Sequence, residues 1–461
     1  MMQITKIPGS IWLFLPALFA FLIVLNWGCQ KESEDTVPAE LPEVITHQVT
    51  DITYNSSKSG GEVTDDGGAA IIYRGVLWNT AGNPTVDDNE GVTSNGKGMG
   101  EFSSNVTGLS PSTTYYLRAY AVNSEGAAYG GEIEFTTDEL IYEPGQSYYG
   151  EHEYIEYIYG NIPLIMSVPH GGYDEPASIP DRSCGVTVRD SYTLELAHEI
   201  RDIIYDRTGY YPHIIISNLR RTKLDPNRAV YEATCNNPQA ETPYYEYHDY
   251  IQTAKDTVEK IHGKGLLIDL HGHGHDIQRL ELGYAISSSE LRLSDSELNS
   301  QTYIDKSSIK NLVYNNPNNY TLSDLLRGPA GLGGMFDNEE IPAVPGFLDP
   351  YPLEGEAYFN GGYITRVHGS RDGGNIDAIQ IECHRDVRFT TSERLKFADG
   401  LVEAVFAFID ENYFEGFSND PGSATVKTFT DNNSYLIPEP VNDYNANCIN
   451  PVDRFFAGLG Q

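Results

Sequence analysis

Short apolar runs alternate with longer amphipathic stretches from residue 162 to residue 412, and this alternation restricts the fold more than any other feature of the sequence. The apolar runs lie at 162–168, 214–219, 266–270 and 378–381, and the helix-like stretches at 190–206, 247–261 and 392–412. Continuous apolar runs are typical of strands buried on both faces, and intervening helices connect such strands in parallel. We therefore predict an α/β domain over residues 151–414, with a mostly parallel or mixed sheet flanked by helices.

Residues 41–137 have a different composition, rich in Gly, Ser, Thr, Asn and Asp, with short β-type runs between turn signals. In the run 114–122, alternate residues differ in polarity, so a strand there would have two distinguishable faces. Tyr115, Leu117 and Ala119 share one of these faces. Several short strands at this spacing predict a small all-β sandwich.

This predicted sandwich resembles a fibronectin type III domain, and three segments carry the resemblance: 74–78, 108–115 and 134–137. The resemblance implies that Tyr115 forms the tyrosine corner of that fold. We expect a spacer or a weak binding module, joined to the α/β domain by a linker at 138–150.

Residues 1–28 resemble a bacterial lipoprotein signal peptide. Lys6 precedes an apolar run at 11–25, and Gly28 and Cys29 follow it. The resemblance implies cleavage before Cys29, lipidation of its thiol and a polar tether over 29–40. We therefore expect lipid anchoring in the bacterial outer membrane, facing the periplasm or the cell surface, and an uncleaved anchor helix is the alternative.

The charge balance excludes one large class of partners. Thirty Lys and Arg against 66 Asp and Glu give a formal net charge of −36. Nucleic-acid binding depends on cationic side chains that neutralise phosphates, so we expect no nucleic-acid partner. The same charge disfavours adhesion of the protein surface to anionic lipid, which leaves the lipid anchor as the membrane attachment.

Four cysteines remain beyond Cys29, namely Cys184, Cys235, Cys383 and Cys448. An even number in an oxidising compartment permits disulfides, and three complete pairings exist. The sequence does not choose among them. It contains no CxxC spacing, which argues against a structural zinc–thiolate site.

Histidines follow two of the predicted strands. His170 lies two residues after the run 162–168, and His271 lies just after the run 266–270. Because the carboxyl ends of parallel strands meet at one edge of a sheet, both imidazoles could face one zinc ion. Three acids compete for the third ligand position: Asp174, Glu175 and Asp190. We favour Asp190, which precedes a predicted helix, and its alternative role is a plain helix N-cap.

Basic residues cluster after the run 214–219, where Arg220 and Arg221 are followed closely by Arg228. An arginine can hold a substrate carboxylate in bidentate fashion, and one near a metal can stabilise charge developing on a carbonyl oxygen. Charge balance with neighbouring acids is the alternative. Glu382 lies within an otherwise apolar strand, where a carboxylate is costly unless it is paired or functional. Near a metal-activated water it could act as general base.

Five motifs in this order resemble the N-formylglutamate amidohydrolase family, which is itself similar to zinc carboxypeptidases. They are SVPHGG at 167–172, LDPNR at 224–228, IDLHGH at 268–273, GGYITR at 361–366 and AIQIECHRDVRF at 378–389. The resemblance covers about residues 160–412. It implies a zinc-dependent amidohydrolase that cleaves an amide C–N bond adjacent to a substrate carboxylate, in an N-formylglutamate-like, N-acyl amino acid or peptide substrate.

The resemblance also implies a role for each matching residue. His170 and His271 become zinc ligands, Asn227 and Arg228 hold the substrate carboxylate, Arg220 or preferably Arg221 polarises the carbonyl, and Glu382 is the general base. The long segment 276–360 departs from the family, and its Gly/Pro-rich part, 328–353, resembles a lid or specificity loop. A C-terminal extension covers 415–461. The competing hypothesis is a non-catalytic surface lipoprotein that keeps a hydrolase-like ligand pocket.

Overall fold

The computed structural model describes residues 38–424, so the predictions for the signal peptide, Cys29, most of the tether and Cys448 lie outside the described residues. The chain divides into two compact units between Leu140 and Ile141. Within residues 38–424, no helix is both long and apolar enough to cross a membrane.

The N-terminal unit is an all-β sandwich, as predicted. Its strands are β1 (Glu43–Thr50), β2 (Ser56–Asp65), β3 (Tyr73–Asn79), β4 (Gly91–Val92), β5 (Gly100–Thr107), β6 (Thr114–Asn123), β7 (Gly126–Tyr129) and β8 (Ile133–Thr136). One sheet has the order β1-β2-β5, and the other has the order β4-β3-β6-β7 with β8 paired to β6. All of these pairings are antiparallel.

The core of this unit follows the predicted alternation in β6. Leu117 and Ala119 are fully buried, and they pack with Val76 and Trp78 of β3. The Tyr115 hydroxyl accepts a hydrogen bond of 3.0 Å from the backbone N–H of Ser110, five residues upstream. This contact is that of a tyrosine corner, so the expectation for Tyr115 is confirmed.

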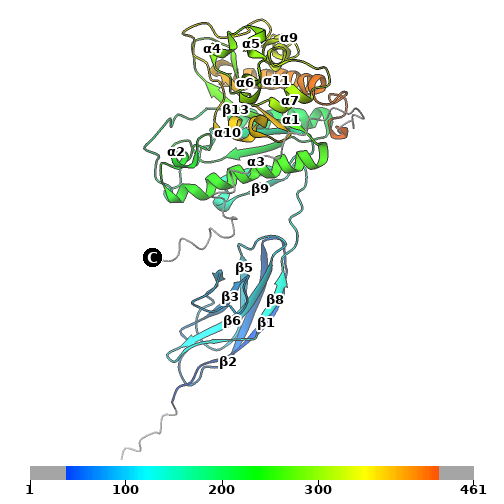
Figure 1. Ribbon diagram of the computed structural model, residues 1–461. Helices are drawn as coiled ribbons and strands as arrows, with labels where there is room; N and C mark the ends of the chain where they lie inside the picture. The colour runs from blue at the N-terminus through cyan, green and yellow to red at the C-terminus, as the bar shows by residue number, and fades with distance from the viewer. Residues whose placement is uncertain (1–37, 425–461) are drawn as a thin grey trace, which may run out of the picture. The chain divides into compact units, whose positions relative to one another are not determined.

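The C-terminal unit contains an eight-stranded mixed sheet in the order β15-β14-β16-β13-β11-β12-β10-β9 (Figure 1). Its strands are β9 (Ser147–Tyr149), β10 (Ile155–Ile158), β11 (Leu164–Val168), β12 (His213–Ser217), β13 (Gly265–His273), β14 (Leu280–Gly283), β15 (Ala343–Val344) and β16 (Ile376–His384). The four central strands β12, β11, β13 and β16 are parallel, and β10 and β14 flank them in antiparallel orientation. The α/β prediction holds, with a sheet that is mixed rather than wholly parallel.

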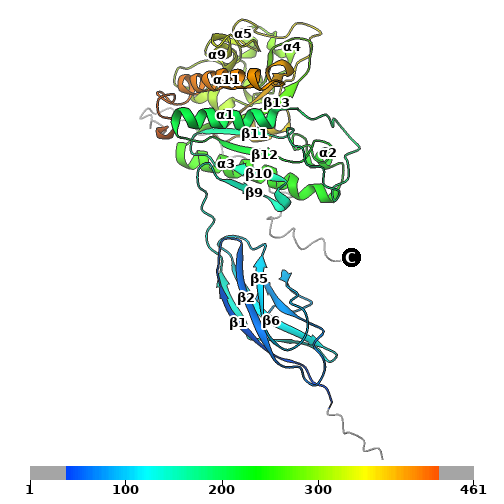
Figure 2. The same cartoon turned by 180° about the vertical axis from the view of Figure 1, so that it is seen from behind.

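Helices cover both faces of this sheet. Helices α1 (Thr193–Thr208) and α11 (Thr391–Asn412) contact each other over one face, and Figure 2 shows them side by side. Their apolar residues share one hydrophobic cluster with β11 and β13. The other face packs against α3 (Glu241–His262), whose residues Tyr247, Ile251 and Val258 join a second cluster. Both faces of the central strands are therefore buried, which explains their continuous apolar runs.

The segment 276–360, which includes the predicted lid, contains regular secondary structure. It contributes β14 and β15 to the sheet and forms six short helices: α4 (Ser288–Leu291), α5 (Asp295–Leu298), α6 (Gln301–Lys306), α7 (Lys310–Asn315), α8 (Leu322–Arg327) and α9 (Leu332–Asn338). The predicted lid, 328–353, contains α9 and β15, which pack into the core through Leu332, Phe336 and Val344. The lid prediction is therefore wrong, because this stretch buries apolar side chains rather than covering a cavity.

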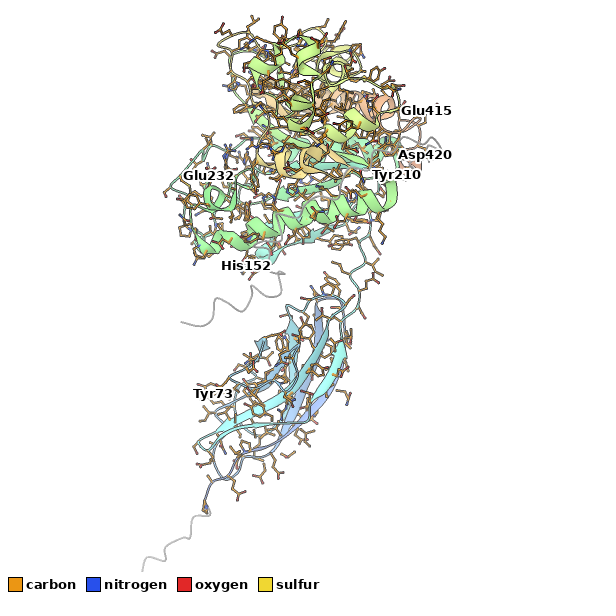
Figure 3. All side chains as sticks on the ribbon, in the orientation of Figure 1. Tyr73, His152, Tyr210, Glu232, Glu415 and Asp420 are labelled. Carbon is orange, nitrogen blue, oxygen red and sulfur yellow. A yellow bond between two sulfur atoms is a disulfide. The ribbon has the colours of Figure 1, made fainter. Side chains whose placement is uncertain are left out.

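Two predicted boundaries also shift. Strand β9 lies within the predicted linker 138–150 and pairs with β10, so the second domain starts earlier than residue 151. The described part of the C-terminal extension, 415–424, packs on the same unit. Phe417 is buried, and Asp420 forms a hydrogen bond with Tyr210 that raises the pKa of the tyrosine (Figure 3).

The buried His213 at the start of β12 predicts an acid-sensitive fold. Its Nδ1 accepts the backbone N–H of Gly160 at 3.2 Å and lies 2.7 Å from the Tyr157 hydroxyl. Burial, with a smaller contribution from His262, lowers the pKa of His213 to about 3. The folded protein therefore keeps this ring neutral between about pH 6.5 and 3, while the unfolded chain binds a proton.

We expect this difference to lower the free energy of unfolding as pH falls from 7 to 5, by about 1–2 kcal/mol from His213 alone. Urea unfolding at both pH values should show a smaller loss for His213→Gln than for the wild type. Equal losses would show that His213 titrates alike in the folded and unfolded states.

Candidate active site

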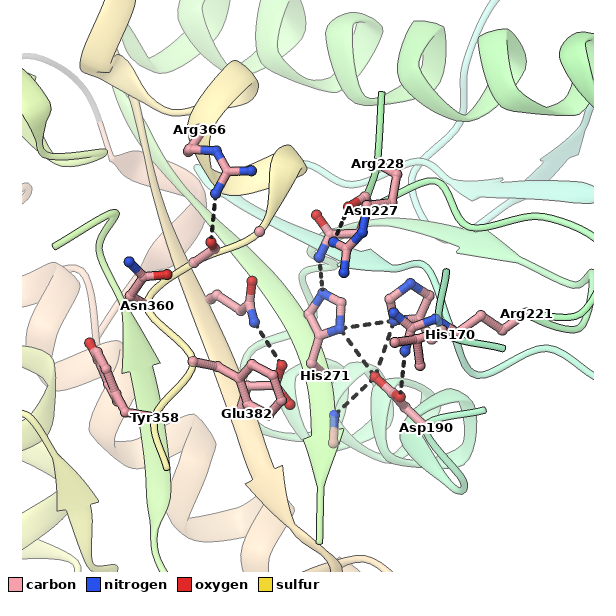
Figure 4. A pocket seen from close by; sticks show the side chains of 16 residues that line it. His170, Asp190, Arg221, Asn227, Arg228, His271, Tyr358, Asn360, Arg366 and Glu382 are labelled. Atoms are coloured by element: carbon pink, nitrogen blue, oxygen red, sulfur yellow. Dashed lines mark hydrogen bonds and ion pairs between the residues drawn. The ribbon is translucent and has the colours of Figure 1, made fainter. Parts of the chain in front are cut away.

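Three predicted ligands converge at the carboxyl ends of β11 and β13. His170 follows β11, His271 lies within β13, and Asp190 precedes α1. The Nδ1 atoms of the two histidines are 3.1 Å apart, and Asp190 Oδ2 lies 3.2 Å from His170 Nδ1 and 3.1 Å from His271 Nδ1. Figure 4 shows the three side chains pointing toward one another. All three are buried, so the fold brings together residues up to 101 positions apart in the chain.

A second carboxylate holds the far side of the His170 ring. His170 Nε2 lies 2.7 Å from Asp225 Oδ1. Arg221 donates from Nε to Asp225 Oδ2 at 3.0 Å, and Arg182 lies 3.8 Å from the same oxygen. Burial alone would raise the pKa of Asp225, but His170 and the two arginines hold it far below its usual range. Asp225 therefore stays ionised and places the proton of the ring on Nε2.

The His271 ring is held in a comparable way. Its Nε2 lies 3.0 Å from Asp269 Oδ2 and 3.0 Å from Asn227 Nδ2. Ser167 donates its hydroxyl to Asp269 Oδ1 at 3.0 Å. Burial alone would lower the pKa of His271, but Asp269 and Asp190 raise it well above the usual value.

Asp190 is fixed by three separate contacts. Its backbone N–H bonds to the His170 carbonyl at 3.1 Å, and its Oδ2 accepts the N–H of Gly272 at 3.2 Å. Arg221 Nη1 lies 3.4 Å from Oδ1. Burial alone would raise the pKa of Asp190, but His170 and His271 lower it well below the usual value. The alternative N-cap role is wrong, because α1 starts at Thr193 with Tyr192 as its N-cap.

Asp174 and Glu175, the other candidates for the third ligand, are exposed. Glu175 instead pairs with Arg220 at 2.8 Å on the surface. Arg220 consequently does not enter the site, which corrects its predicted role in substrate binding. Arg221 instead turns inward, where it contacts Asp225 and Asp190.

The converging atoms suit a zinc ion. They comprise two imidazole nitrogens and one carboxylate oxygen, the ligand types found in catalytic zinc sites with an open position for water. Each imidazole places its other nitrogen beside a buried aspartate, the arrangement that fixes the tautomer and orientation of metal-bound histidines. Rings held in this way direct both Nδ1 atoms at one point. His170, Asp190 and His271 therefore fit a divalent metal ion.

These side chains open onto a cavity of about 400 Å³. Glu382 lines it and is the cross-strand neighbour of His271. Gln380 donates from Nε2 to Glu382 Oε1 at 2.7 Å. The pKa of Glu382 is raised to about 8: burial is the largest cause, the nearby His271 lowers the pKa, and Asp190, Glu281 and Asp269 raise it.

The opposite wall of the cavity is basic. Arg228 and Arg366 both line it, and Arg366 comes from α10 (Tyr363–His368). Burial lowers the pKa of Arg366, and Arg371 and Arg228 lower it further. Arg366 is the last residue of the GGYITR motif and was not among the predicted site residues. The remaining lining residues include Val186, Tyr358, Phe359 and Asn360.

Asn227 lines the cavity but its polar atoms are engaged with the protein. Its Oδ1 accepts the backbone N–H of Ile364 at 2.8 Å, and its Nδ2 faces His271. Asn227 therefore joins the start of α10 to the His271 ring. Sequence reasoning also missed Asp225 and Asp269, although both lie within the quoted motifs LDPNR and IDLHGH.

A disulfide between Cys184 and Cys235 connects two segments that line the site. Cys383 is free and buried. Cys184 lies six residues before Asp190, and Cys235 is the C-cap of α2 (Val230–Thr234), shortly after Arg228. The bond therefore ties the segment that leads to Asp190 to the segment that carries Asn227 and Arg228.

Replacing both Cys184 and Cys235 with serine is expected to lower the free energy of unfolding by about 4 kcal/mol, because the bond closes a loop with a sequence separation of 51. Urea unfolding of the two proteins measures the difference. The Cys383→Ser variant controls for loss of a thiol. An unchanged midpoint for the double variant would show that the disulfide does not constrain this region.

No protein-family model matches the chain, and no curated protein matches it. The solved structures similar to it include the sensor domain of the anti-sigma factor RsgI4 in Pseudobacteroides cellulosolvens, at 20% identity over 22% of this chain and 96% of that chain, with a TM-score of 0.17. The sixth fibronectin type III domain of human fibronectin type III domain containing protein 3 has 22% identity over 24% of this chain and 97% of that chain, with a TM-score of 0.18. Fibronectin type III domains thus match a small part of the chain, and the amidohydrolase resemblance depends on its motifs alone.

Proposed function

We propose that the C-terminal unit is a zinc-dependent amidohydrolase that cleaves an amide C–N bond next to a substrate carboxylate. The observation that carries the proposal is the mutual approach of His170, Asp190 and His271, within 3.1–3.2 Å, at the floor of a cavity with a carboxylate and two arginines. The resemblance of five ordered motifs to the N-formylglutamate amidohydrolase family supports the same assignment.

The three ligands would leave an open position for water and for the substrate carbonyl. Zinc bound there would act as a Lewis acid and lower the pKa of a water toward about 7. Glu382, beside His271 in the neighbouring strand, would in its ionised form accept a proton from the attacking water and pass it to the leaving amine. Gln380 would hold the Glu382 carboxylate in place through its 2.7 Å hydrogen bond.

Arg221 is the proposed partner of the carbonyl oxygen. Asp225 and Asp190 fix its guanidinium at the edge of the cavity, so it needs little rearrangement when negative charge develops on that oxygen. The family resemblance implies the same role for Arg221. Arg221 would in addition hold the carboxylates of Asp225 and Asp190 in position.

Arg228 and Arg366 are the proposed binding groups for the substrate carboxylate. Two guanidinium groups that face one cavity create a locally positive pocket in a protein of net charge −36. The substrate is then an N-formylglutamate-like compound, an N-acyl amino acid or a peptide with a free carboxylate. Lipid anchoring through Cys29 in the bacterial outer membrane and a fibronectin type III-like spacer remain proposals that complement this activity.

Hydrolysis of an N-acyl amino acid and of its carboxamide analogue tests this assignment. The zinc-loaded protein should cleave the acid and discriminate strongly against the uncharged analogue. Arg228→Gln should raise KM for the acid about 10- to 100-fold, the cost of a charge-assisted hydrogen bond, with a much smaller effect on the analogue.

Arg220→Gln is the matched control, because Arg220 is the neighbouring surface arginine that pairs with Glu175. It should leave both KM values unchanged. Equal hydrolysis of acid and carboxamide by the wild type would contradict the carboxylate-binding role of the basic wall.

A further inference from the structure

A second cluster of metal-ligand side chains lies beyond the first along β13. It comprises His273, His275 and Glu281. Glu281 Oε1 lies 2.7 Å from His275 Nδ1 and 3.8 Å from His273 Nδ1. Two nitrogens and one oxygen again suit zinc or a similar divalent transition metal, with room for a water ligand. We infer that this cluster is a second metal site, which fixes the wall of the cavity rather than taking part in the reaction.

The orientation of His273 supports this role. Its Nε2 donates to the carbonyl oxygen of Arg279 at 2.9 Å, so the lone pair of the neutral ring lies on Nδ1, on the side of Glu281. A backbone carbonyl that accepts from the far nitrogen is a common orienting partner of a metal-bound histidine. The same Nδ1 accepts the backbone N–H of His275 at 3.2 Å, which also shows that its lone pair lies on this side of the ring.

The environment of Glu281 favours a bound cation. The carboxylate is only 1% exposed, and among residues 38–424 its ion-pair partners are the two imidazoles. Its cross-strand neighbour in β16 is Glu382, a second buried carboxylate. Buried carboxylates are costly unless charge is neutralised nearby, and a divalent ion held by both imidazoles would do this permanently.

The two sites are separate. His271 and His273 lie two residues apart in one strand, which places them about 7 Å apart along it. Metal ions that act together in catalysis are about 3.5–4 Å apart and share ligands, whereas these clusters share none. The second ion would therefore not contact the reacting atoms of the first site.

The contacts of Glu281 connect the second site to the cavity. Its Oε2 accepts the backbone N–H of Phe359 at 2.8 Å, and the Phe359 ring stacks on His275 with centroids 4.8 Å apart. Phe359 lines the cavity of the first site. An ion held by His275 and Glu281 would thus fix the 358–362 segment, which carries one wall of that cavity.

Metal analysis of the full chain after zinc loading and removal of excess ion tests the inference. We expect two zinc ions per chain in the wild type and one in His275→Gln, which loses only a partly exposed ligand. His152→Gln removes an exposed histidine outside both clusters and should keep both ions. Circular dichroism confirms that each variant is folded.

Two further variants separate this inference from the proposed function. His170→Ala/His271→Ala should retain one ion, and adding His275→Gln should remove it. If the first site binds no metal, the wild type should bind one ion that only His275→Gln or Glu281→Gln removes. Unchanged zinc content in both His275→Gln and Glu281→Gln would overturn the second site. If His275→Gln or Glu281→Gln is unfolded, zinc titration of the chelator-stripped His170→Ala/His271→Ala protein tests the second site instead. Absence of zinc binding in that titration would overturn the second site.

Discussion

Replacing Glu382 with glutamine is expected to lower kcat about 10²- to 10⁴-fold while the metal content of the first site stays unchanged. Glutamine keeps the size of the side chain and can still contact Gln380, but it cannot accept the proton of the attacking water. Glu382 is not one of the three converging ligands, so zinc binding should survive. Steady-state hydrolysis and metal analysis on the same preparations measure both effects.

Glu175→Gln is the control for this variant, because it neutralises an exposed glutamate that pairs with Arg220 at the surface. It should have full activity. Turnover of Glu382→Gln close to that of the wild type would exclude Glu382 as the general base. A wild type that binds N-acyl amino acids without hydrolysing them would favour the alternative, a non-catalytic binding lipoprotein.

The double variant His170→Ala/His271→Ala is expected to lose the metal ion of the first site and all turnover. Two of three protein ligands disappear, and a single aspartate does not hold zinc at micromolar concentration. Metal analysis and hydrolysis assays of the folded protein measure the loss. The same variant also leaves Asp225 and Asp269 without their imidazole partners.

Loss of those partners should reduce stability as well, by an amount of the order of 3–5 kcal/mol at Asp269, whose ion-pair partner among residues 38–424 is His271, and by less at Asp225, which keeps Arg221. Thermal unfolding therefore accompanies the metal analysis. His170→Gln/His271→Gln keeps a hydrogen-bonding group beside each aspartate and serves as a milder variant. Zinc retention at this site in both folded double variants would contradict the proposed ligand set.

Much of the site was predictable because strand ends are visible in the sequence. The apolar runs before His170 and His271 identify buried strands, and the carboxyl ends of neighbouring parallel strands meet at one edge. Glu382 was conspicuous because a carboxylate in an apolar strand is costly. Asp190 was favoured over two nearer acids, and the fold does place it at the histidines.

Other features were not predictable because they depend on side-chain direction. Arg220 and Arg221 are adjacent in the sequence, yet one pairs with Glu175 outside and the other with Asp225 inside. Arg366 lies on α10, and the hydrogen bond from the Ile364 N–H to Asn227 holds the start of this helix. The position of the helix brings Arg366 to the cavity. Segment 328–353 has the Gly and Pro content of a loop but contributes buried residues to the core.

Hydrophobic periodicity and strand-end motifs are local properties, so they were enough to predict the all-β and α/β units, the strands of the central sheet and most residues of the candidate site. The Cys184–Cys235 pairing, the support of His170 by Asp225 and the second cluster around Glu281 became visible only in the folded chain. The disulfide joins residues 51 positions apart, and the contact between His170 and Asp225 joins residues 55 positions apart. The members of the second cluster lie up to 8 positions apart. In each case the packing of several elements brings the side chains together. Distance in space and the direction of each side chain are set by that packing, and no local pattern encodes them.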